Sequence, residues 1–232
     1  MTTSPRAMPA FTDAGILDVW HANAAPWVVA VREQRIESRR LATDQAIVDA
    51  VLACSPRTVL DIGCGEGWLA RRLAETGIEV TGIDAVPTLI EQARAAGGGD
   101  FRVMSYEAIA DSGLDAQFDA LVCNFSLLGE ASVERMFALF RSMLKPRGHV
   151  LIQTLHPLIA CGDETYQDGW RQGSWAGLGV DFGDPAPWYF RTLESWFGLF
   201  ARHGLRVLDM REPLHPQTRM PASVIFGAQA VD

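Results

Sequence analysis

Two acidic residues and three glycines have the spacing of a nucleotide-binding turn. Gly63, Gly65 and Gly67 occupy alternate positions, Asp61 precedes them, and Asp84 lies 21 residues after the first glycine. Glycine permits positive φ angles and lets a ligand press against bare backbone. A carboxylate can accept hydrogen bonds from two adjacent ribose hydroxyls, and an acid about 20 residues beyond a glycine turn is placed to do so. The alternative is that Asp84 caps the helix that follows it.

The residues around the glycines predict a strand, a turn and a helix. Residues 58–62 are β-branched or apolar apart from Asp61, as in a buried strand, and residues 69, 70 and 73 are apolar at helical spacing. A doubly wound α/β sheet presents a nucleotide site in this way, with free helix N–H groups aimed at the ligand. A dinucleotide fingerprint needs its third glycine five residues after the first. Trp68 holds that position, which argues against an NAD-dependent enzyme.

Strand and helix patterns alternate along most of the remaining chain, which implies parallel strands joined by right-handed crossovers. We expect an α/β fold with a doubly wound, mostly parallel, Rossmann-like sheet of seven strands at residues 58–62, 78–84, 100–104, 118–124, 149–155, 205–210 and 222–230. The chain divides into an N-terminal helical cap (1–40), a core (41–155), an insert or lid (156–190), and a C-terminal helix with the last two strands (191–232). Apolar residues within 14–31 predict one or two helices broken near Pro26.

The composition argues against several kinds of partner. The formal net charge is −8 and the sequence pI is near 5.1, whereas nucleic-acid-binding proteins usually carry a basic face. No apolar run approaches the roughly 20 residues that span a bilayer, and the N-terminus lacks a signal pattern, so we expect a cytoplasmic protein without a membrane partner. The four cysteines form no CxxC pair, so neither a metal site nor a disulfide framework is predicted.

The chain resembles class I S-adenosylmethionine-dependent methyltransferases at the stretch Asp61-Ile62-Gly63-Cys64-Gly65-Glu66-Gly67, since their first motif is an acid and a hydrophobe followed by GxGxG. The resemblance covers roughly residues 40–155, and residues 191–232 are similar to the closing segment of small-molecule and ubiquinone-biosynthesis-type members. It implies an enzyme that uses S-adenosyl-L-methionine and acts on a small-molecule methyl acceptor. The alternatives are a protein that binds S-adenosylmethionine or S-adenosylhomocysteine without turnover, and a tRNA or protein methyltransferase.

The resemblance also implies a set of cofactor contacts, namely Asp61, Gly63, Cys64, Gly65, Gly67, Asp84, Ala85, Ser105, Tyr106, Asn124, Phe125 and Arg40. Asp61 would lie beneath the methionine moiety, and Asp84 would bind the ribose. Many relatives have an acid at the position of Ser105, which accepts a hydrogen bond from the adenine amino group. A serine accepts that bond more weakly, but the backbone N–H of Tyr106 could still reach the adenine ring.

Three of the implied roles have plain alternatives. Asn124 and Phe125 end the fourth strand near the methyl donor and the acceptor, but Asn124 could instead form a turn. Arg40, with its neighbour Arg39, could bind the cofactor carboxylate or could be a solvated charge. His156 follows the fifth strand and is the candidate catalytic base for an acceptor hydroxyl or amine. The alternative is that it is a turn residue.

Residues 156–190 interrupt the alternation of strands and helices with a Gly- and Trp-rich segment that has no sustained period. An irregular connection of this length is uncommon inside a domain unless it is functional or disordered. Its aromatic residues, among them Trp170, Trp175 and Trp188, should be buried, and the segment leaves the carboxyl edge of the sheet. We expect a lid over the methyl acceptor, with aromatic and acidic residues that favour a cationic acceptor. A surface flap or a dimer contact is the alternative.

Overall fold

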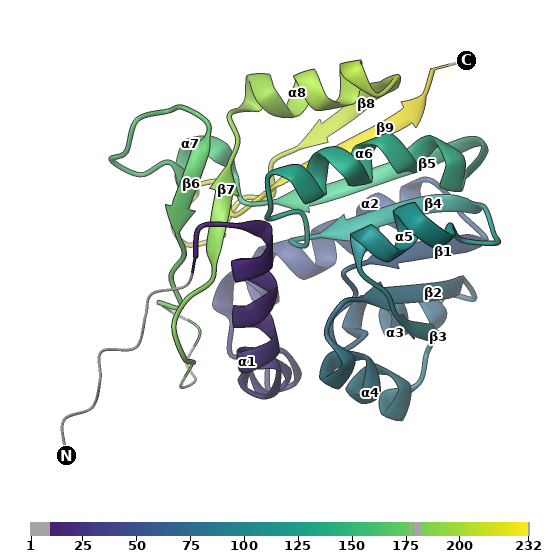
Figure 1. Ribbon diagram of the computed structural model, residues 1–232, viewed down its shortest axis with the longest axis horizontal. Helices are drawn as coiled ribbons and strands as arrows, with labels where there is room; N and C mark the ends of the chain where they lie inside the picture. The colour runs from purple at the N-terminus through teal and green to yellow at the C-terminus, as the bar shows by residue number, and fades with distance from the viewer. Residues whose placement is uncertain (1–9, 177, 179–181, 232) are drawn as a thin grey trace.

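A sheet of seven strands runs through the residues that the computed structural model describes, 10–176, 178 and 182–231 (Figure 1). In chain order the strands are β1 (Thr58–Ile62), β2 (Glu79–Asp84), β3 (Asp100–Val103), β4 (Phe118–Asn124), β5 (Leu144–Thr154), β8 (Leu205–Arg211) and β9 (Val224–Ala230). They lie in the order β3-β2-β1-β4-β5-β9-β8, and every pairing is parallel except the two made by β9. The predicted fold class, a doubly wound and mostly parallel sheet, is confirmed.

Burial explains why the central strands form. Every residue of β1 after Thr58 is buried, which is the continuous run expected of a strand covered on both faces. Parallel pairing then brings the carboxyl ends of neighbouring strands to one edge of the sheet. Ile62 of β1 is beside Ile83 of β2, and Asn124 of β4 is beside Gln153 of β5. The predicted turn and strand-end residues therefore meet at this edge.

Helices cover both faces of the sheet (Figure 1). One face carries α2 (Asp44–Ala53), which follows the short π-helix η1 (Arg39–Thr43), together with α3 (Trp68–Ala74) and α4 (Pro87–Ala96). The other face carries α5 (Tyr106–Ser112), α6 (Ala131–Met143) and α8 (Leu193–Arg202). Met136, Phe137 and Phe140 of α6 are buried at helical spacing against the sheet. No helix in the described ranges is both long and apolar enough to cross a membrane.

The N-terminal helix α1 (Asp13–Arg32) continues through Pro26 instead of breaking there. A proline removes the hydrogen bond to the carbonyl four residues earlier. That carbonyl belongs to Ala22, an exposed residue. Ala24 and Val28 of α1 pack against the start of α4. The predicted break is wrong because this packing outweighs the local cost of the proline.

Residues 156–190 are more regular than their composition predicts. They contain a short helix, α7 (Pro157–Ala160), and two strands, β6 (Gly169–Gln172) and β7 (Pro187–Phe190), which pair antiparallel in a separate two-stranded ribbon. Trp170 packs edge-on against Tyr189 across the ribbon, with 5.6 Å between ring centroids. The ribbon stands beside α1 (Figure 1). Its strands are four residues long, too short to give a detectable alternation in the sequence.

Candidate active site

A pocket of ≈ 380 Å³ opens at the carboxyl edge of the sheet, where β1 lies between β2 and β4. The strand order reverses at this point, and ligands of open α/β sheets bind in such crevices. Most of the predicted cofactor contacts line the pocket, namely Gly63, Cys64, Gly65, Asp84, Ala85, Ser105, Tyr106, Asn124 and Phe125. The predicted site residues that do not line it are Asp61, Gly67, Arg40 and His156.

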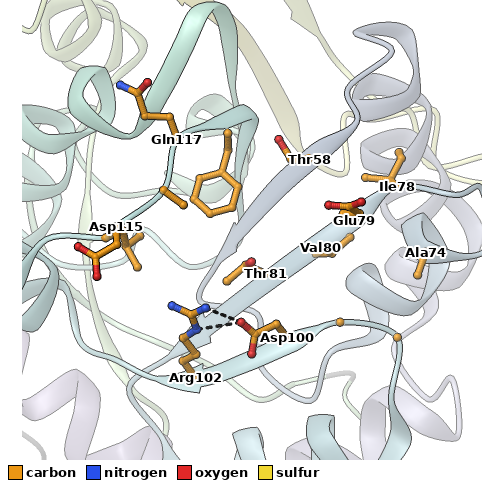
Figure 2. Close-up of a pocket in the computed structure, with 15 residues that line it drawn as sticks. Thr58, Ala74, Ile78, Glu79, Val80, Thr81, Asp100, Arg102, Asp115 and Gln117 are labelled. Atoms are coloured by element: carbon orange, nitrogen blue, oxygen red, sulfur yellow. Dashed lines mark hydrogen bonds and ion pairs between the residues drawn. The ribbon is translucent and has the colours of Figure 1, made fainter.

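A second hollow, of ≈ 610 Å³, lies at the opposite edge of the sheet (Figure 2). It runs past Thr58, Glu79 and Phe118, the first residues of β1, β2 and β4. Figure 2 shows that this hollow contains an ion pair, in which Arg102 Nη2 lies 2.6 Å from Asp100 Oδ2. Both side chains are more than half exposed. Exposed ion pairs of this kind contribute little to stability. The glycine turn, moreover, lies at the other edge of the sheet. We therefore place the candidate site in the pocket at the carboxyl edge.

The glycines of the turn all adopt positive φ, with values of 75°, 57° and 83°, but for different reasons. A Cβ on Gly63 would lie 2.3 Å from the Cβ of Ser126, and a Cβ on Gly67 would lie 2.8 Å from a phenyl ring on β3. These two positions need glycine for packing, and Gly67 faces the core instead of the predicted ligand. A Cβ on Gly65 would meet only the indole nitrogen of Trp27, at 3.6 Å. Gly65 is therefore the residue that presents bare backbone to the pocket.

Asp84 links the end of β2 to the glycine turn. Its Oδ2 accepts a hydrogen bond from the Gly65 N–H at 2.9 Å, and its Oδ1 accepts one from the Val86 N–H at 2.9 Å. Burial raises the pKa of this carboxyl, and the two hydrogen bonds partly offset that rise. The helix-cap alternative is wrong, because the N-cap residue of α4 is Val86. Each carboxylate oxygen keeps a lone pair, so Asp84 can also accept hydrogen bonds from a ligand in the pocket.

Asp61 lies two residues before the turn and outside the pocket lining, with 1% of its surface exposed. Its Oδ2 has no hydrogen-bond partner among the described residues. Burial, and next the negative charge of Asp84, raise the pKa of Asp61 to about 7. Both effects favour the protonated form of the Asp61 carboxyl, whereas a nearby cation would favour its ionised form.

Replacing Asp61 by asparagine should change how stability depends on pH. The Asp61 pKa rises from 3.8 to about 7 on folding, so between these values the folded protein holds a proton that the unfolded chain has lost. The contribution of Asp61 to the free energy of unfolding therefore falls as pH rises through this range. We therefore expect the free energy of unfolding of Asp61→Asn, relative to that of wild type, to rise by more than about 1 kcal/mol when the pH is raised from about 5 to about 8. Urea unfolding at both pH values measures this, and a pH-independent difference would contradict it.

The side chains on the core side of the pocket are held by neighbouring groups. Ser105 is the N-cap of α5 and accepts a backbone hydrogen bond in its first turn at 3.2 Å. Tyr106 donates its hydroxyl proton to the Ser126 carbonyl at 3.0 Å, and burial raises the pKa of this phenol. Asn124 Oδ1 accepts a hydrogen bond from Gln153 Nε2 at 3.0 Å. The fold thus fixes the orientation of these side chains, and Tyr106 presents a neutral ring to the pocket.

The arginine that lines the pocket is Arg39 and not the predicted Arg40, which is exposed. Arg39 Nε donates to Asp44 Oδ1 at 2.9 Å. Its guanidinium carbon lies 4.7 Å from the ring centroid of Trp68 and 5.7 Å from that of Trp27. Neighbouring side chains of a helix point in different directions, so contacts with these rings, and not the local sequence, decide which arginine faces the pocket.

His156 lies beside the pocket and not in it. Its side chain is 2% exposed, and its Nε2 is 2.7 Å from Glu212 Oε1. Its Nδ1 is buried without a partner among the described residues. The neighbouring Leu155 lines the pocket instead. Since a general base must reach the proton that it removes, this position does not support the predicted role of His156 in catalysis.

Part of the pocket wall comes from α1 and from the insert that was predicted to be a lid, and these residues were not among the predicted cofactor contacts. Helix α1 contributes Ile16, Leu17 and Trp20, and the insert contributes Trp175 and Leu178. The rings of Trp20 and Trp175 meet edge-on, with 5.6 Å between their centroids. The apolar stripe of α1 was the signal for this wall, but such a stripe also fits ordinary core packing.

The acids of the insert lie away from the pocket. None of those described within 156–190 lines it, and Asp181 lies outside the described residues. Asp168 Oδ1 instead accepts a hydrogen bond from the Thr192 N–H at 2.8 Å. The prediction of a cationic acceptor was based partly on these acids, and their position gives it no support.

Comparison with known proteins identifies a domain in the part of the chain that contains the glycine turn and Asp84. Residues 59–148 match a family model described as "Methyltransferase domain". The chain is 34% identical over 114 residues to a ubiquinone biosynthesis O-methyltransferase of Xanthomonas oryzae pv. oryzae (strain PXO99A), covering 47% of this chain and 47% of that protein. A protein of the same name from Xylella fastidiosa (strain M23) is 34% identical over 114 residues, covering 47% and 46%. The chain thus spans about half the length of these curated relatives.

Solved structures of other proteins share the fold of most of this chain. A magnesium protoporphyrin IX methyltransferase from Synechocystis PCC 6803 superimposes with a TM-score of 0.64 at 16% identity, covering 93% of this chain and 99% of that chain. An S-adenosylmethionine dependent methyltransferase from Mesorhizobium loti gives a TM-score of 0.59 at 21% identity, covering 78% and 95%. At these identities the likeness concerns the fold.

Proposed function

We propose that this chain, a member of the class I methyltransferases, transfers a methyl group from S-adenosylmethionine to a small-molecule acceptor. The observation that carries the proposal is the position of Asp84, which binds the Gly65 N–H and lines the same pocket as the turn. A carboxylate at the end of the second strand, beside bare glycine backbone, suits the ribose hydroxyls of a nucleoside ligand. The residues matched by the methyltransferase family model include both groups.

The cofactor end of the pocket has groups that suit each part of S-adenosylmethionine. Asp84 and Ala85 would hold the ribose, and Tyr106 would contact the adenine with its neutral ring or its backbone N–H. Asp61 is buried outside the pocket lining, so its charge, and not a direct contact, would stabilise the cationic end of the methionine moiety. Arg39 takes the place of Arg40 as the candidate partner of the methionine carboxylate.

The acceptor end of the pocket lies between α1 and the insert. When bound, S-adenosylmethionine supplies a methyl group already activated by its sulfonium, so the protein has mainly to align the acceptor. Leu17 and Trp20 of α1 and Trp175 of the insert form an apolar and aromatic wall there, which suits the apolar body of a small molecule. The net charge of −8 favours such an acceptor over a nucleic acid, and we propose a cytoplasmic location.

The insert is proposed to act as a lid over this end of the pocket. Besides the contact between Trp175 and Trp20, the Gly183 N–H donates to Asn23 Oδ1 of α1 at 2.7 Å. We expect amide hydrogen exchange in residues 169–176 to slow when S-adenosylhomocysteine and an acceptor are both bound, because ligands stabilise the closed arrangement. Mass spectrometry of peptides from this segment measures the effect. Exchange that is the same with and without both ligands would contradict the lid.

Turnover on a panel of acceptors tests the function. Purified protein would be incubated with S-adenosylmethionine and with phenols, catechols, amines, thiols or carboxylic acids, and the formation of S-adenosylhomocysteine would be measured. Acceptors with a hydroxyl group come first because the curated relatives are named O-methyltransferases. Product formation that depends on one acceptor class supports the proposal. Binding of S-adenosylmethionine without turnover on any acceptor would favour a binding protein, and turnover only on tRNA or protein would contradict the small-molecule acceptor.

A further inference from the structure

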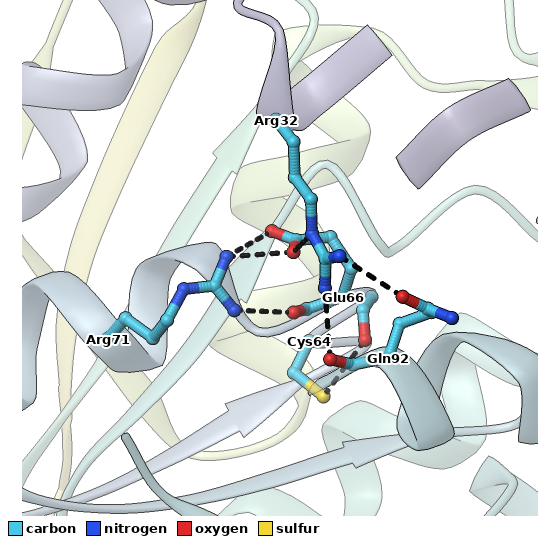
Figure 3. Close-up of polar contacts among 6 residues, drawn as sticks. Arg32, Cys64, Glu66, Arg71 and Gln92 are labelled. Atoms are coloured by element: carbon cyan, nitrogen blue, oxygen red, sulfur yellow. Dashed lines mark hydrogen bonds and ion pairs between the residues drawn. The ribbon is translucent and has the colours of Figure 1, made fainter. Parts of the chain in front are cut away.

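Between two glycines of the turn lies Glu66, whose carboxylate Figure 3 shows in contact with two arginines. The Glu66 side chain has 0% of its surface exposed. Its oxygens accept hydrogen bonds from Arg71 Nη2 at 2.7 Å and from Arg32 Nε at 2.9 Å. Arg71 Nη1 also donates to the Glu66 carbonyl at 2.7 Å. A buried charge requires such partners, because leaving it unpaired is strongly destabilising.

The two arginines connect Glu66 to different parts of the molecule. Arg71 belongs to α3, the helix that follows the turn, so its bonds are local. Arg32 is the last residue of α1. Figure 3 shows that Arg32 also reaches Gln92 of α4, donating to the side-chain oxygen at 3.1 Å and to the backbone carbonyl at 3.0 Å. Arg32 therefore joins α1 to the turn and to α4 at one point.

Helix α1 spans the pocket between two polar anchors. At its first residue, Asp13 accepts hydrogen bonds from the N–H groups of Glu130 at 2.8 Å and Ser132 at 3.1 Å, at the start of α6. Between Asp13 and the Arg32 anchor, α1 lines the pocket with Trp20 and Trp27. Helix α1 therefore closes the pocket on this side, held at both ends by these polar contacts and between them by the packing of Ala24 and Val28 on α4.

We infer that Glu66 is a positioning residue that couples the glycine turn to α1 through Arg32 and so keeps α1 closed over the bound cofactor. The inference rests on the proposed function, since closed α1 places the Trp27 indole beside Gly65 at the cofactor end. The Arg32 contact is the part of the network that can open. Its side chain is 38% exposed, so water can replace its bonds, whereas Glu66 keeps Arg71 in either arrangement.

The variants Arg32→Met and Arg71→Met separate this role from plain structural support. Each removes one cation from the same buried carboxylate, but only Arg32 lies on α1. We expect Arg32→Met to speed dissociation of S-adenosylhomocysteine roughly 3- to 10-fold, the range of one ordinary hydrogen bond, because the Arg32 side chain is partly exposed to water. Stopped-flow tryptophan fluorescence measures this rate. Amide exchange of residues 13–32 in the ligand-free protein should also be faster in Arg32→Met than in Arg71→Met.

The exchange measurement keeps the inference separate from the proposed function. Failure of wild type to bind S-adenosylhomocysteine would overturn the function, whereas exchange in α1 tests the coupling without any ligand. If the two variants change α1 exchange equally, or if neither changes it, Glu66 only braces the fold and the inference is wrong. If Arg32→Met does not fold, Arg32→Lys serves instead. It keeps the charge but cannot make all the bonds to Glu66 and Gln92, so a smaller change in the same direction is expected, and no change would overturn the inference.

Discussion

Asp84→Asn is expected to weaken binding of S-adenosylhomocysteine roughly 10- to 150-fold, the effect of losing about 1.5–3 kcal/mol from a buried, charge-assisted hydrogen bond. The substitution keeps the size of the side chain but replaces one acceptor oxygen with an amino group. Oδ2 of Asp84 accepts from the Gly65 N–H and Oδ1 accepts from the Val86 N–H, so either replacement removes one of these bonds. It also removes lone pairs that would accept hydrogen bonds from the ribose hydroxyls. Isothermal titration calorimetry measures the change in affinity.

Asp119 provides a matched control at the opposite edge of the sheet. Its Oδ2 accepts hydrogen bonds from the N–H groups of Arg57 at 3.0 Å and Thr58 at 2.9 Å. Asp119→Asn should therefore lower stability while leaving the affinity for S-adenosylhomocysteine within about twofold, because the two sites do not touch. Wild-type affinity in Asp84→Asn, or an equal loss in both variants, would show that Asp84 does not bind the ribose.

Gly65→Ala is expected to reduce the affinity for S-adenosylhomocysteine at least about tenfold, or about 1.4 kcal/mol, while the protein remains folded. An alanine tolerates a φ of 57° at a cost of about 1–2 kcal/mol, as is usual for a left-handed residue. Its Cβ would meet only the Trp27 indole nitrogen, at 3.6 Å, so the fold can accommodate it. The added methyl group would instead occupy the space through which a ligand approaches the backbone.

Gly77→Ala is the control for backbone strain. Gly77 has a φ of 87°, and a Cβ there would meet nothing within 4 Å. Both alanines should therefore lower the thermal stability similarly, but only Gly65→Ala should lose affinity in calorimetry. Gly63→Ala would not serve, since its Cβ would lie 2.3 Å from Ser126 and the variant would report on folding. Equal affinities in Gly65→Ala and Gly77→Ala would contradict a ligand that presses against Gly65.

The sheet was predictable because its strands are specified by local patterns. The run of apolar residues at 58–62 predicts a buried strand, and the regular alternation of strands with helices predicts a doubly wound sheet. The differences arise where distant contacts decide the structure. Helix α1 runs through Pro26 because it packs on α4. The ribbon of β6 and β7 is stabilised by an aromatic pair across strands far apart in the sequence.

The core side of the site was predictable for the same reason. Gly65, Asp84 and Asn124 follow or end strands whose parallel pairing brings them to one edge. The directions of the other side chains were not predictable. His156 turns to Glu212, which lies 56 residues away, and its neighbour lines the pocket. No motif marks the wall that α1 contributes, because an apolar helix face fits core packing equally well.

A crystal structure with S-adenosylhomocysteine would show directly whether Asp84 binds the ribose. We expect the ribose hydroxyls within hydrogen-bond distance of the Asp84 carboxylate, with the adenine at Tyr106 and the homocysteine carboxylate toward Arg39. Binding in the hollow at the opposite edge, past Thr58 and Glu79, or in the pocket with the ribose away from Asp84, would contradict it.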